Sequence, residues 1–169
     1  MSEAQQAIQD GAREIDMVIN IGALKSQNYE IFYEDIRAVV EASAGYIVKV
    51  ILETVFLTDD EKIAASFLAA EAGATFVKTC TGFNGGGASA ADVALMKKTV
   101  SYKESLKVKA SAGIRTYEAC IEMLQAGADR IGTFVFQSWS LCLLNIDRLF
   151  SVLIQIIWRG YHAESRIQS

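Results

Sequence analysis

Apolar runs and amphipathic stretches alternate along most of the chain, and glycine marks the boundaries between them. Four helical patterns end in glycine, and a run rich in β-branched residues follows each one, at Gly11, Gly45, Gly73 and Gly127. Glycine just past a helix end takes the left-handed conformation that other residues avoid. Repeated helix–glycine–strand units predict a parallel sheet with helical crossovers.

Five strands are expected from the short apolar runs, which have the composition of strands covered on both faces. They fall near residues 14–20, 46–52, 74–79, 106–110 and 129–133. Helix starts are also visible: Thr58 and Ser89 each stand three residues before an acid, as in a capping box, and Thr116 is positioned to cap a helix over 117–126.

Helix 29–43 shows the clearest amphipathic pattern. Its charged residues fall mostly on the opposite side from an apolar face. That face is predicted to contain Ile31, Phe32, Ile36, Val39 and Val40.

Two lysines lie inside predicted strands, Lys78 in TFVKTCTGF and Lys109 in LKVKASAGIRT. Lysine is rarely buried, and an amine held out of water near a second cation is a better nucleophile. Strand alternation places both lysines and Asp16 on the inner face if helices cover the outside, with Lys49 as a further candidate. Charged groups collected inside a sheet are typical of a (β/α) barrel.

Each of these residues also has a structural explanation. A single strand lysine is compatible with snorkelling from an edge strand, and Asp16 with a carboxylate satisfied by the backbone. Glycine-rich loops are often plain turns. The combination of two strand lysines, a strand aspartate and two glycine loops in matching positions favours carbonyl chemistry on a phosphorylated substrate.

The composition indicates the number of domains, the class of ligand and the cellular compartment. The 169 residues are one domain's worth, 51% are hydrophobic, and the net charge of -4 is mixed along the chain, which argues against a nucleic-acid surface. Cys80, Cys120 and Cys142 show no metal-ligand spacing, and the start of the chain is polar rather than a signal peptide. We therefore expect a cytoplasmic protein with reduced thiols.

Residues 134–169 differ in character from the rest and are strongly apolar at first. Asn145, Asp147 and Arg148 interrupt the apolar stretch, so neither half reaches the roughly 20 residues of a membrane span. The chain is therefore divided into an incomplete barrel domain over 1–133 and a divergent apolar helical tail over 134–169.

Five segments resemble, in order and spacing, the signatures of bacterial-type deoxyribose-phosphate aldolase: GAREIDMVINIG, YIVKVILET, FVKTCTGFNGGGA, VKASAGIRT and GADRIGT. The resemblance implies an α/β fold, part of a TIM (β/α)8 barrel with about five of its eight parallel units. It also implies a class I lyase that needs no metal or other cofactor. Such an enzyme reversibly cleaves 2-deoxy-D-ribose 5-phosphate to D-glyceraldehyde 3-phosphate and acetaldehyde through a lysine Schiff base.

The resemblance also assigns roles by position. Lys78 matches the Schiff-base lysine, and Lys109 matches the second lysine, which keeps the first uncharged and joins the proton relay. Asp16 matches the acid of that relay, expected to act through water and Lys109. Thr81 matches a polar residue of the pocket, and Gly82 and Gly113 match backbone contacts to phosphate or substrate.

Several features depart from the family pattern. The match begins before the family's fourth strand, so the chain is expected to start inside the domain. Phe134-Val135-Phe136 stands where a Ser-Ser-Gly phosphate loop is expected, and Ala112 replaces the first glycine of a pair. Two alternatives therefore remain: a non-catalytic relic or interaction protein that keeps aldolase motifs, and another Schiff-base, phosphate-binding barrel enzyme. Assembly as a homo-oligomer or with a separately encoded N-terminal piece is also open.

Overall fold

The computed structural model describes residues 2–133. The predicted helical tail over 134–169 and the altered phosphate loop at 134–136 lie outside the described residues.

The described part of the chain forms one parallel sheet, in the order β1-β2-β3-β4-β5. Every strand pairs with its sequence neighbour in parallel, as the repeated units predicted. The strands are β1 Glu14–Val18, β2 Ile47–Ile51, β3 Phe76–Lys78, β4 Lys107–Ser111 and β5 Arg130–Gly132. All five lie where the sequence placed them.

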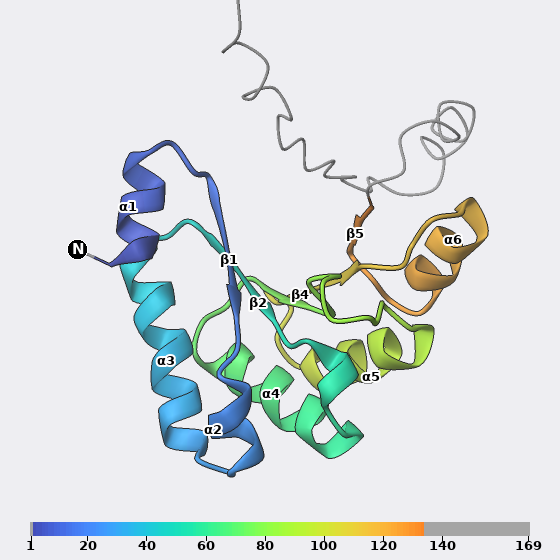
Figure 1. Ribbon diagram of the computed structural model, residues 1–169, viewed down its shortest axis with the longest axis horizontal. Helices are drawn as coiled ribbons and strands as arrows, with labels where there is room; N and C mark the ends of the chain where they lie inside the picture. Colours follow the sequence, from blue (N-terminus) through green and yellow to red (C-terminus); the bar gives the residue numbers. More distant parts are fainter. Residues whose placement is uncertain (1, 134–169) are drawn as a thin grey trace, which may run out of the picture.

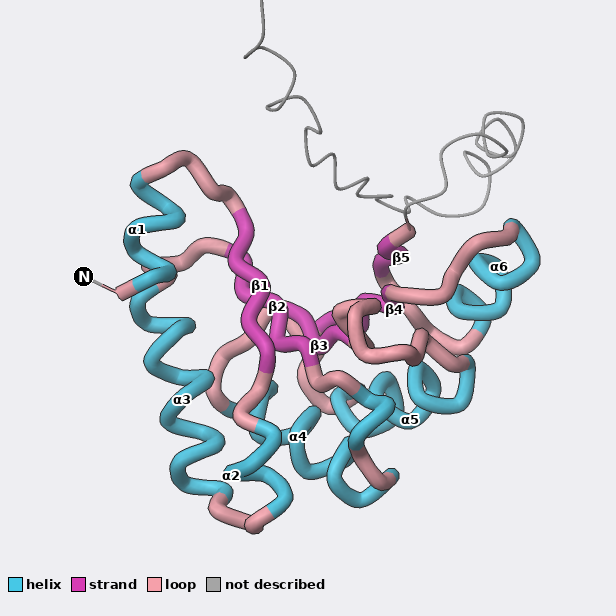
Figure 2. Tube along the Cα trace, viewed as in Figure 1, coloured by secondary structure: helices cyan, strands magenta, loops and turns pink. Residues whose placement is uncertain are grey.

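Helices arc around one face of this sheet and leave its inner face free of described helices (Figure 1). Figure 2 shows the strands at the centre, with the helices outside them. The helices are α1 Glu3–Gln9, α2 Ile21–Lys25, α3 Tyr29–Ala42, α4 Asp59–Glu71, α5 Ala90–Val100 and α6 Tyr117–Gln125, with a 3-10 turn η1 at Thr54–Phe56. This arrangement is part of a (β/α) barrel, as predicted. None of the described helices is long and apolar enough to cross a membrane.

Local signals in the sequence set the helix boundaries. The four glycines after helices all have positive φ, between 87° and 107°. Thr58 and Glu61 form the complete, reciprocal capping box at the start of α4. The Ser89 and Thr116 side chains accept from the amides of Asp92 and Ala119. These predictions are confirmed.

The hydrophobic core lies between the outer face of the sheet and the helices. It contains the outward residues of the strands, among them Val48, Val50, Val77, Val108 and Ile131. On α3, Phe32 and Ile36 are buried, but Ile31 is 52% exposed, so its predicted place on the buried face is wrong. Ile31 precedes Phe32 by one residue, which turns it about 100° away from the buried stripe.

Candidate active site

The inner face of the sheet gathers the charged strand residues. Asp16 is the register partner of Lys49, and Lys78 is the register partner of Lys109. Both of the proposed catalytic lysines lie on central strands, β3 and β4, so the interpretation as edge-strand snorkelling is wrong. Lys49 is buried beside them, which confirms its expected place in the interior.

A cavity of about 550 Å³ opens on this inner face. Of the site residues predicted from sequence, Asp16, Lys78, Lys109 and Thr81 line it, and Gly82 and Gly113 do not. Its wall also includes Arg13, Glu14, Lys49, Ile51, Phe83, Ser111, Ala112, Gly132 and Thr133. Four basic and two acidic side chains therefore face the cavity, which favours an anionic ligand.

Ion pairs run across the inner face from β5 to β3. Arg130 pairs with Glu14 at 3.0 Å, and Glu14 with Lys49 at 2.8 Å. Asp16 Oδ1 then accepts from Lys49 at 2.5 Å, and Asp16 Oδ2 from Lys78 at 2.8 Å. The Arg130–Glu14 pair joins the two edge strands of the described sheet, so the network spans the open side of the partial barrel.

Asp16 is held by side chains rather than by the backbone. Its carboxylate accepts from two lysines and, among the described residues, from no backbone amide. Burial acts to raise the pKa of Asp16, but the hydrogen bonds from Lys49 and Lys78 outweigh burial and lower it below its usual value. Asp16 is therefore ionised at neutral pH and fixes the position of Lys78 Nζ.

Unlike Lys78, Lys109 has no carboxylate partner among the described residues. Its side chain is buried, with 1% of the residue exposed, and its Nζ has no hydrogen-bond partner within residues 2–133. Burial, then the positive charge of Lys78, lowers the pKa of Lys109 to about 8. Gly132 leaves the room that this side chain occupies, since a Cβ there would lie 3.3 Å from Lys109 Cε.

Two loops meet beside the cavity at Gly82 and Ala112. Both residues have positive φ, and a Cβ at Gly82 would lie 3.3 Å from the Ala112 Cβ. Gly113 also has positive φ. The amides of Gly82 and Gly113 donate no hydrogen bond to any described residue, so both remain available to a ligand.

Replacing Ala112 by glycine is expected to stabilise the protein. Ala112 has φ of 76°, a conformation that costs a residue with a Cβ about 1–2 kcal/mol. The greater freedom of glycine in the unfolded chain offsets part of the gain, so we expect Ala112→Gly to raise the free energy of unfolding by about 0.5–1 kcal/mol. Urea denaturation of the native chain and the variant would measure this difference in the free energy of unfolding.

Ala44 offers a matched control for this substitution, because it also has positive φ, of 49°, and lies after α3. Ala44→Gly should give a similar gain in stability without changing the binding of inorganic phosphate. Ala112→Gly should raise stability and also strengthen the binding of inorganic phosphate, because it removes the methyl group from the cavity wall. Equal phosphate affinity in the two variants would show that the Ala112 methyl does not obstruct the ligand.

The sequence patterns did not reveal four charged residues of this region, one of which is Arg13 in the cavity wall. Glu14 precedes Asp16 by two positions, and Arg130 opens the last strand, so period-two alternation could have indicated that both face inward. Glu53 is different, because its position depends on a left-handed backbone that no local pattern reveals. No group of three or more potential metal ligands occurs within residues 2–133.

The sequence of this chain is similar to those of known aldolases. The family model described as DeoC/LacD family aldolase matches residues 1–145. The deoxyribose-phosphate aldolase of Streptococcus sanguinis (strain SK36) is 60% identical over 131 residues, covering 78% of this chain and 59% of that protein. The chain thus spans about three fifths of the length of such curated relatives.

Solved structures agree with this result. A putative deoxyribose-phosphate aldolase from Coccidioides immitis superposes with a TM-score of 0.77 at 47% identity, covering 87% of this chain and 57% of that one. A tetrameric deoxyribose phosphate aldolase from Aeropyrum pernix gives a TM-score of 0.69 at 33% identity, with 78% and 55% covered. The family match, covering most of the sequence, agrees with the paired interior lysines in showing that this chain belongs to the DeoC/LacD family of aldolases.

Proposed function

We propose that this chain carries the carbonyl site of a deoxyribose-phosphate aldolase, with Lys78 as the Schiff-base residue. The observation that carries the proposal is the pair of buried lysines on neighbouring strands, Lys78 and Lys109, beside the Asp16 carboxylate. The substrate would be 2-deoxy-D-ribose 5-phosphate, cleaved reversibly to D-glyceraldehyde 3-phosphate and acetaldehyde.

The reaction would begin when Lys78, which pairs with Asp16 as an ammonium group, releases a proton and attacks the aldehyde of the open-chain sugar. Asp16 Oδ2 lies 2.8 Å from Lys78 Nζ, where it can receive the proton that the nitrogen loses as the carbinolamine forms. Loss of water from the carbinolamine then gives an iminium ion, which draws electrons from the neighbouring carbons.

Cleavage would follow from the iminium. A base removes the proton of the C3 hydroxyl, the C2–C3 bond breaks, and the electron pair moves into an enamine on Lys78 while glyceraldehyde 3-phosphate leaves. Lys109, with a pKa of about 8, is suited to exchange this proton near neutral pH. Protonation of the enamine carbon and hydrolysis of the resulting iminium release acetaldehyde and restore the lysine.

The phosphate of the substrate would lie near the two glycine loops. Gly82 and Gly113 have amides without acceptors among the described residues, and the cavity wall is predominantly basic. Thr81 donates its hydroxyl proton to Glu53, so this hydroxyl would act toward the substrate as an acceptor. We also propose that copies of this chain associate, as in the tetrameric relative from Aeropyrum pernix.

Borohydride trapping tests the proposal. The purified chain, checked for folding and for mass by light scattering, is incubated with acetaldehyde or deoxyribose 5-phosphate, reduced, and mapped by peptide mass spectrometry. We expect added mass on Lys78 in the native chain and none in Lys78→Ala, because only the neutral amine at this position forms the covalent bond to substrate.

Lys107→Ala is the control, since Lys107 lies at the exposed start of β4. An adduct confined to Lys109 would contradict the assignment of the two lysines. A folded chain with no adduct would favour a non-catalytic protein that retains aldolase motifs. That alternative is supported by the two unpaired edge strands, β1 and β5, of the described sheet.

A further inference from the structure

Glu53 is a buried carboxylate that no step of the proposed reaction uses. It lies between β2 and α4 and is 2% exposed. Its backbone is left-handed, with φ of 54° and ψ of 60°. This conformation is unfavourable for any residue with a Cβ, and glycine would adopt it more easily. A buried acidic residue with a strained backbone at such a position indicates that its side chain has a functional role there.

The carboxylate of Glu53 accepts from three donors of the loop that follows β3. The Thr81 amide donates to Oε1 at 3.1 Å, the Thr81 hydroxyl to Oε2 at 2.5 Å, and Asn84 Nδ2 to Oε2 at 3.1 Å. No described lysine or arginine pairs with this carboxylate. Its charge is therefore balanced by hydrogen bonds from the loop, and such charge-assisted bonds are stronger than neutral ones.

A second contact joins the same two segments. A Cβ at Gly86 would lie 1.9 Å from Val55 Cγ1, so the side chain of Val55 occupies the space that a larger residue at position 86 would need. Residues 53–55 thus contact the loop at both Thr81–Asn84 and Gly86. The loop itself is rich in glycine, which gives it many alternative conformations unless neighbouring groups hold it.

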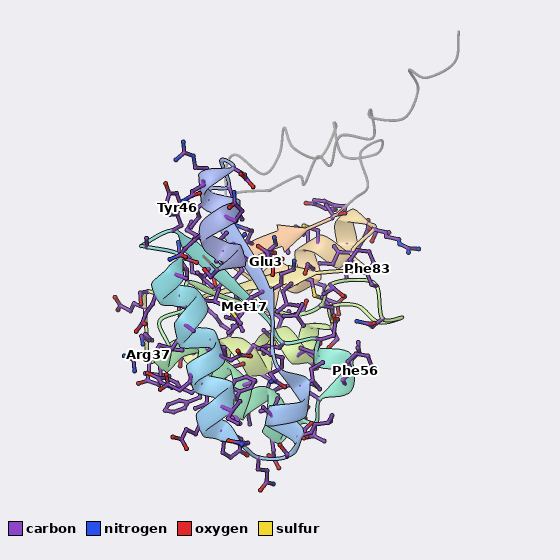
Figure 3. The ribbon with its side chains drawn as sticks, turned by 60° about the vertical axis from the view of Figure 1, so that its left-hand side comes forward. Glu3, Met17, Arg37, Tyr46, Phe56 and Phe83 are labelled. Carbon is purple, nitrogen blue, oxygen red and sulfur yellow. The ribbon has the colours of Figure 1, made fainter. Side chains whose placement is uncertain are left out.

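This loop adjoins the cavity, so its contacts with residues 53–55 affect the cavity wall. Lys78 ends β3 three residues before Thr81, and Phe83 lines the cavity although its residue is 88% exposed. Figure 3 shows Phe83 and Phe56 on the side of the molecule away from Arg37 of α3. Between Thr81 and Phe83 lies Gly82, whose amide has no acceptor in the described part of the chain.

We propose that Glu53 is a positioning residue for the phosphate end of the substrate. By accepting hydrogen bonds from the amide and the hydroxyl of Thr81, it fixes the loop so that the Gly82 amide stands beside the cavity and Phe83 lines it. This inference rests on the proposed aldolase function. Glu53 touches neither the reacting carbonyl nor the lysines, so its loss should weaken binding of a phosphorylated substrate more than it affects adduct formation by acetaldehyde.

Three variants test the inference: Glu53→Ala, Glu53→Gln and Asn84→Ala. Glu53→Ala should raise KM for deoxyribose 5-phosphate about tenfold or more, the effect of losing roughly one charge-assisted hydrogen bond, with kcat changed much less. Glu53→Gln keeps an oxygen for the Thr81 amide but presents an N–H donor toward both the Thr81 hydroxyl and Asn84, which share Oε2. Its rise in KM should therefore lie between that of Asn84→Ala and that of Glu53→Ala. Trapping by acetaldehyde at Lys78 should proceed in all three.

Hydrogen exchange measured by mass spectrometry gives a readout that does not need turnover. Amides of residues 81–86 should exchange faster in Glu53→Ala, with smaller increases in Glu53→Gln and Asn84→Ala, while β4 stays protected. Native exchange in this loop together with native KM in Asn84→Ala and Glu53→Gln would overturn the inference, even if Glu53→Ala does not fold. Equal loss of acetaldehyde trapping and phosphorylated-substrate binding in a folded Glu53→Ala would also overturn it.

The two proposals fail in different ways. Failure of the aldolase function would appear as absence of adduct and turnover in the native chain. Failure of the Glu53 inference would appear as native exchange of the loop in the variants, whatever the native chain catalyses. Faster exchange confined to residues 81–86, accompanied by weaker binding of inorganic phosphate, would support the positioning role without turnover.

Discussion

Lys109→Met is expected to stabilise the protein at pH 7 by about 2 kcal/mol and to lower turnover by about 10²-fold or more. Lys109 is buried, its Nζ has no hydrogen-bond partner within residues 2–133, and it lies on the same face as Lys78. Methionine has a similar length and no charge, so it removes the desolvation cost. It also removes the proton that Lys109 would exchange in the proposed cleavage step.

The sign of the pH dependence follows from the lowered pKa of Lys109, about 8 against an ordinary 10.5. Between these values the unfolded chain binds more protons at this position than the folded chain, so stability rises with pH. Below pH 8 the cost of the buried charge is fully present, with an upper limit of about 3 kcal/mol. The advantage of Lys109→Met should therefore shrink as pH rises from 8 toward 10.5.

Urea denaturation of native chain and variant at pH 7 and pH 10 would measure both effects. Lys107→Met is the matched control, because Lys107 is in the same strand but exposed. We expect it to change stability little at either pH. A Lys109→Met protein that is less stable than the native chain at pH 7, or whose difference does not depend on pH, would contradict the expectation.

Asp16→Asn is expected to have the opposite effect on stability, lowering the free energy of unfolding by about 2 kcal/mol. The substitution leaves Lys78 without its carboxylate and Lys49 with Glu14 alone. Removing one partner of a fully buried ion pair costs about 3–5 kcal/mol. The Asp16 side chain is 29% exposed, and solvent screening reduces that figure.

Acid titration separates this contribution from others. Because the pKa of Asp16 is lowered in the folded chain, its stabilisation is complete above the ordinary value of 3.8 and is lost as pH falls through the folded pKa. Asp16→Asn should therefore lose less stability than the native chain on acidification below pH 4. Thermal unfolding followed by circular dichroism across this range would show it.

Glu34→Gln provides the comparison for a surface pair, since Glu34 and Arg37 lie 3.8 Å apart with both side chains about half exposed. We expect Glu34→Gln to change the free energy of unfolding far less than Asp16→Asn does, because solvent screens an exposed pair. If Asp16→Asn were as mild as Glu34→Gln, the inner-face network would not stabilise the fold. Turnover of Asp16→Asn should also fall, because the proposed proton acceptor for Lys78 is lost.

Much of this fold could be read from local sequence patterns. Glycine after each helix, the Thr58 capping box and apolar runs at regular positions set the five strands and most helix boundaries. These signals depend on backbone preferences and hydrogen bonds within a few residues. Alternation within strands likewise indicated the inward positions of Asp16, Lys78 and Lys109, because side chains on a strand point alternately to its two faces.

The pairing of these inward groups could not be read in the same way. Asp16 bonds to Lys49 and Lys78, from strands 33 and 62 residues later in the chain. Arg130 and Glu14 meet across 116 residues. Such contacts depend on the curvature and register of the whole sheet, and a one-residue change of register would turn the side chains to the other face.

The sequence by itself determined the units of this protein: parallel strands, their covering helices and an inner face that carries lysines and an acid. Only the tertiary structure decided which lysine has a carboxylate partner, which is buried without one, and how Glu53 reaches the loop after β3. The physical reason is the separation along the chain between the groups that interact. Helix caps and strand faces follow from neighbouring residues, whereas the charge state of a buried amine depends on every charge and on the solvent excluded around it.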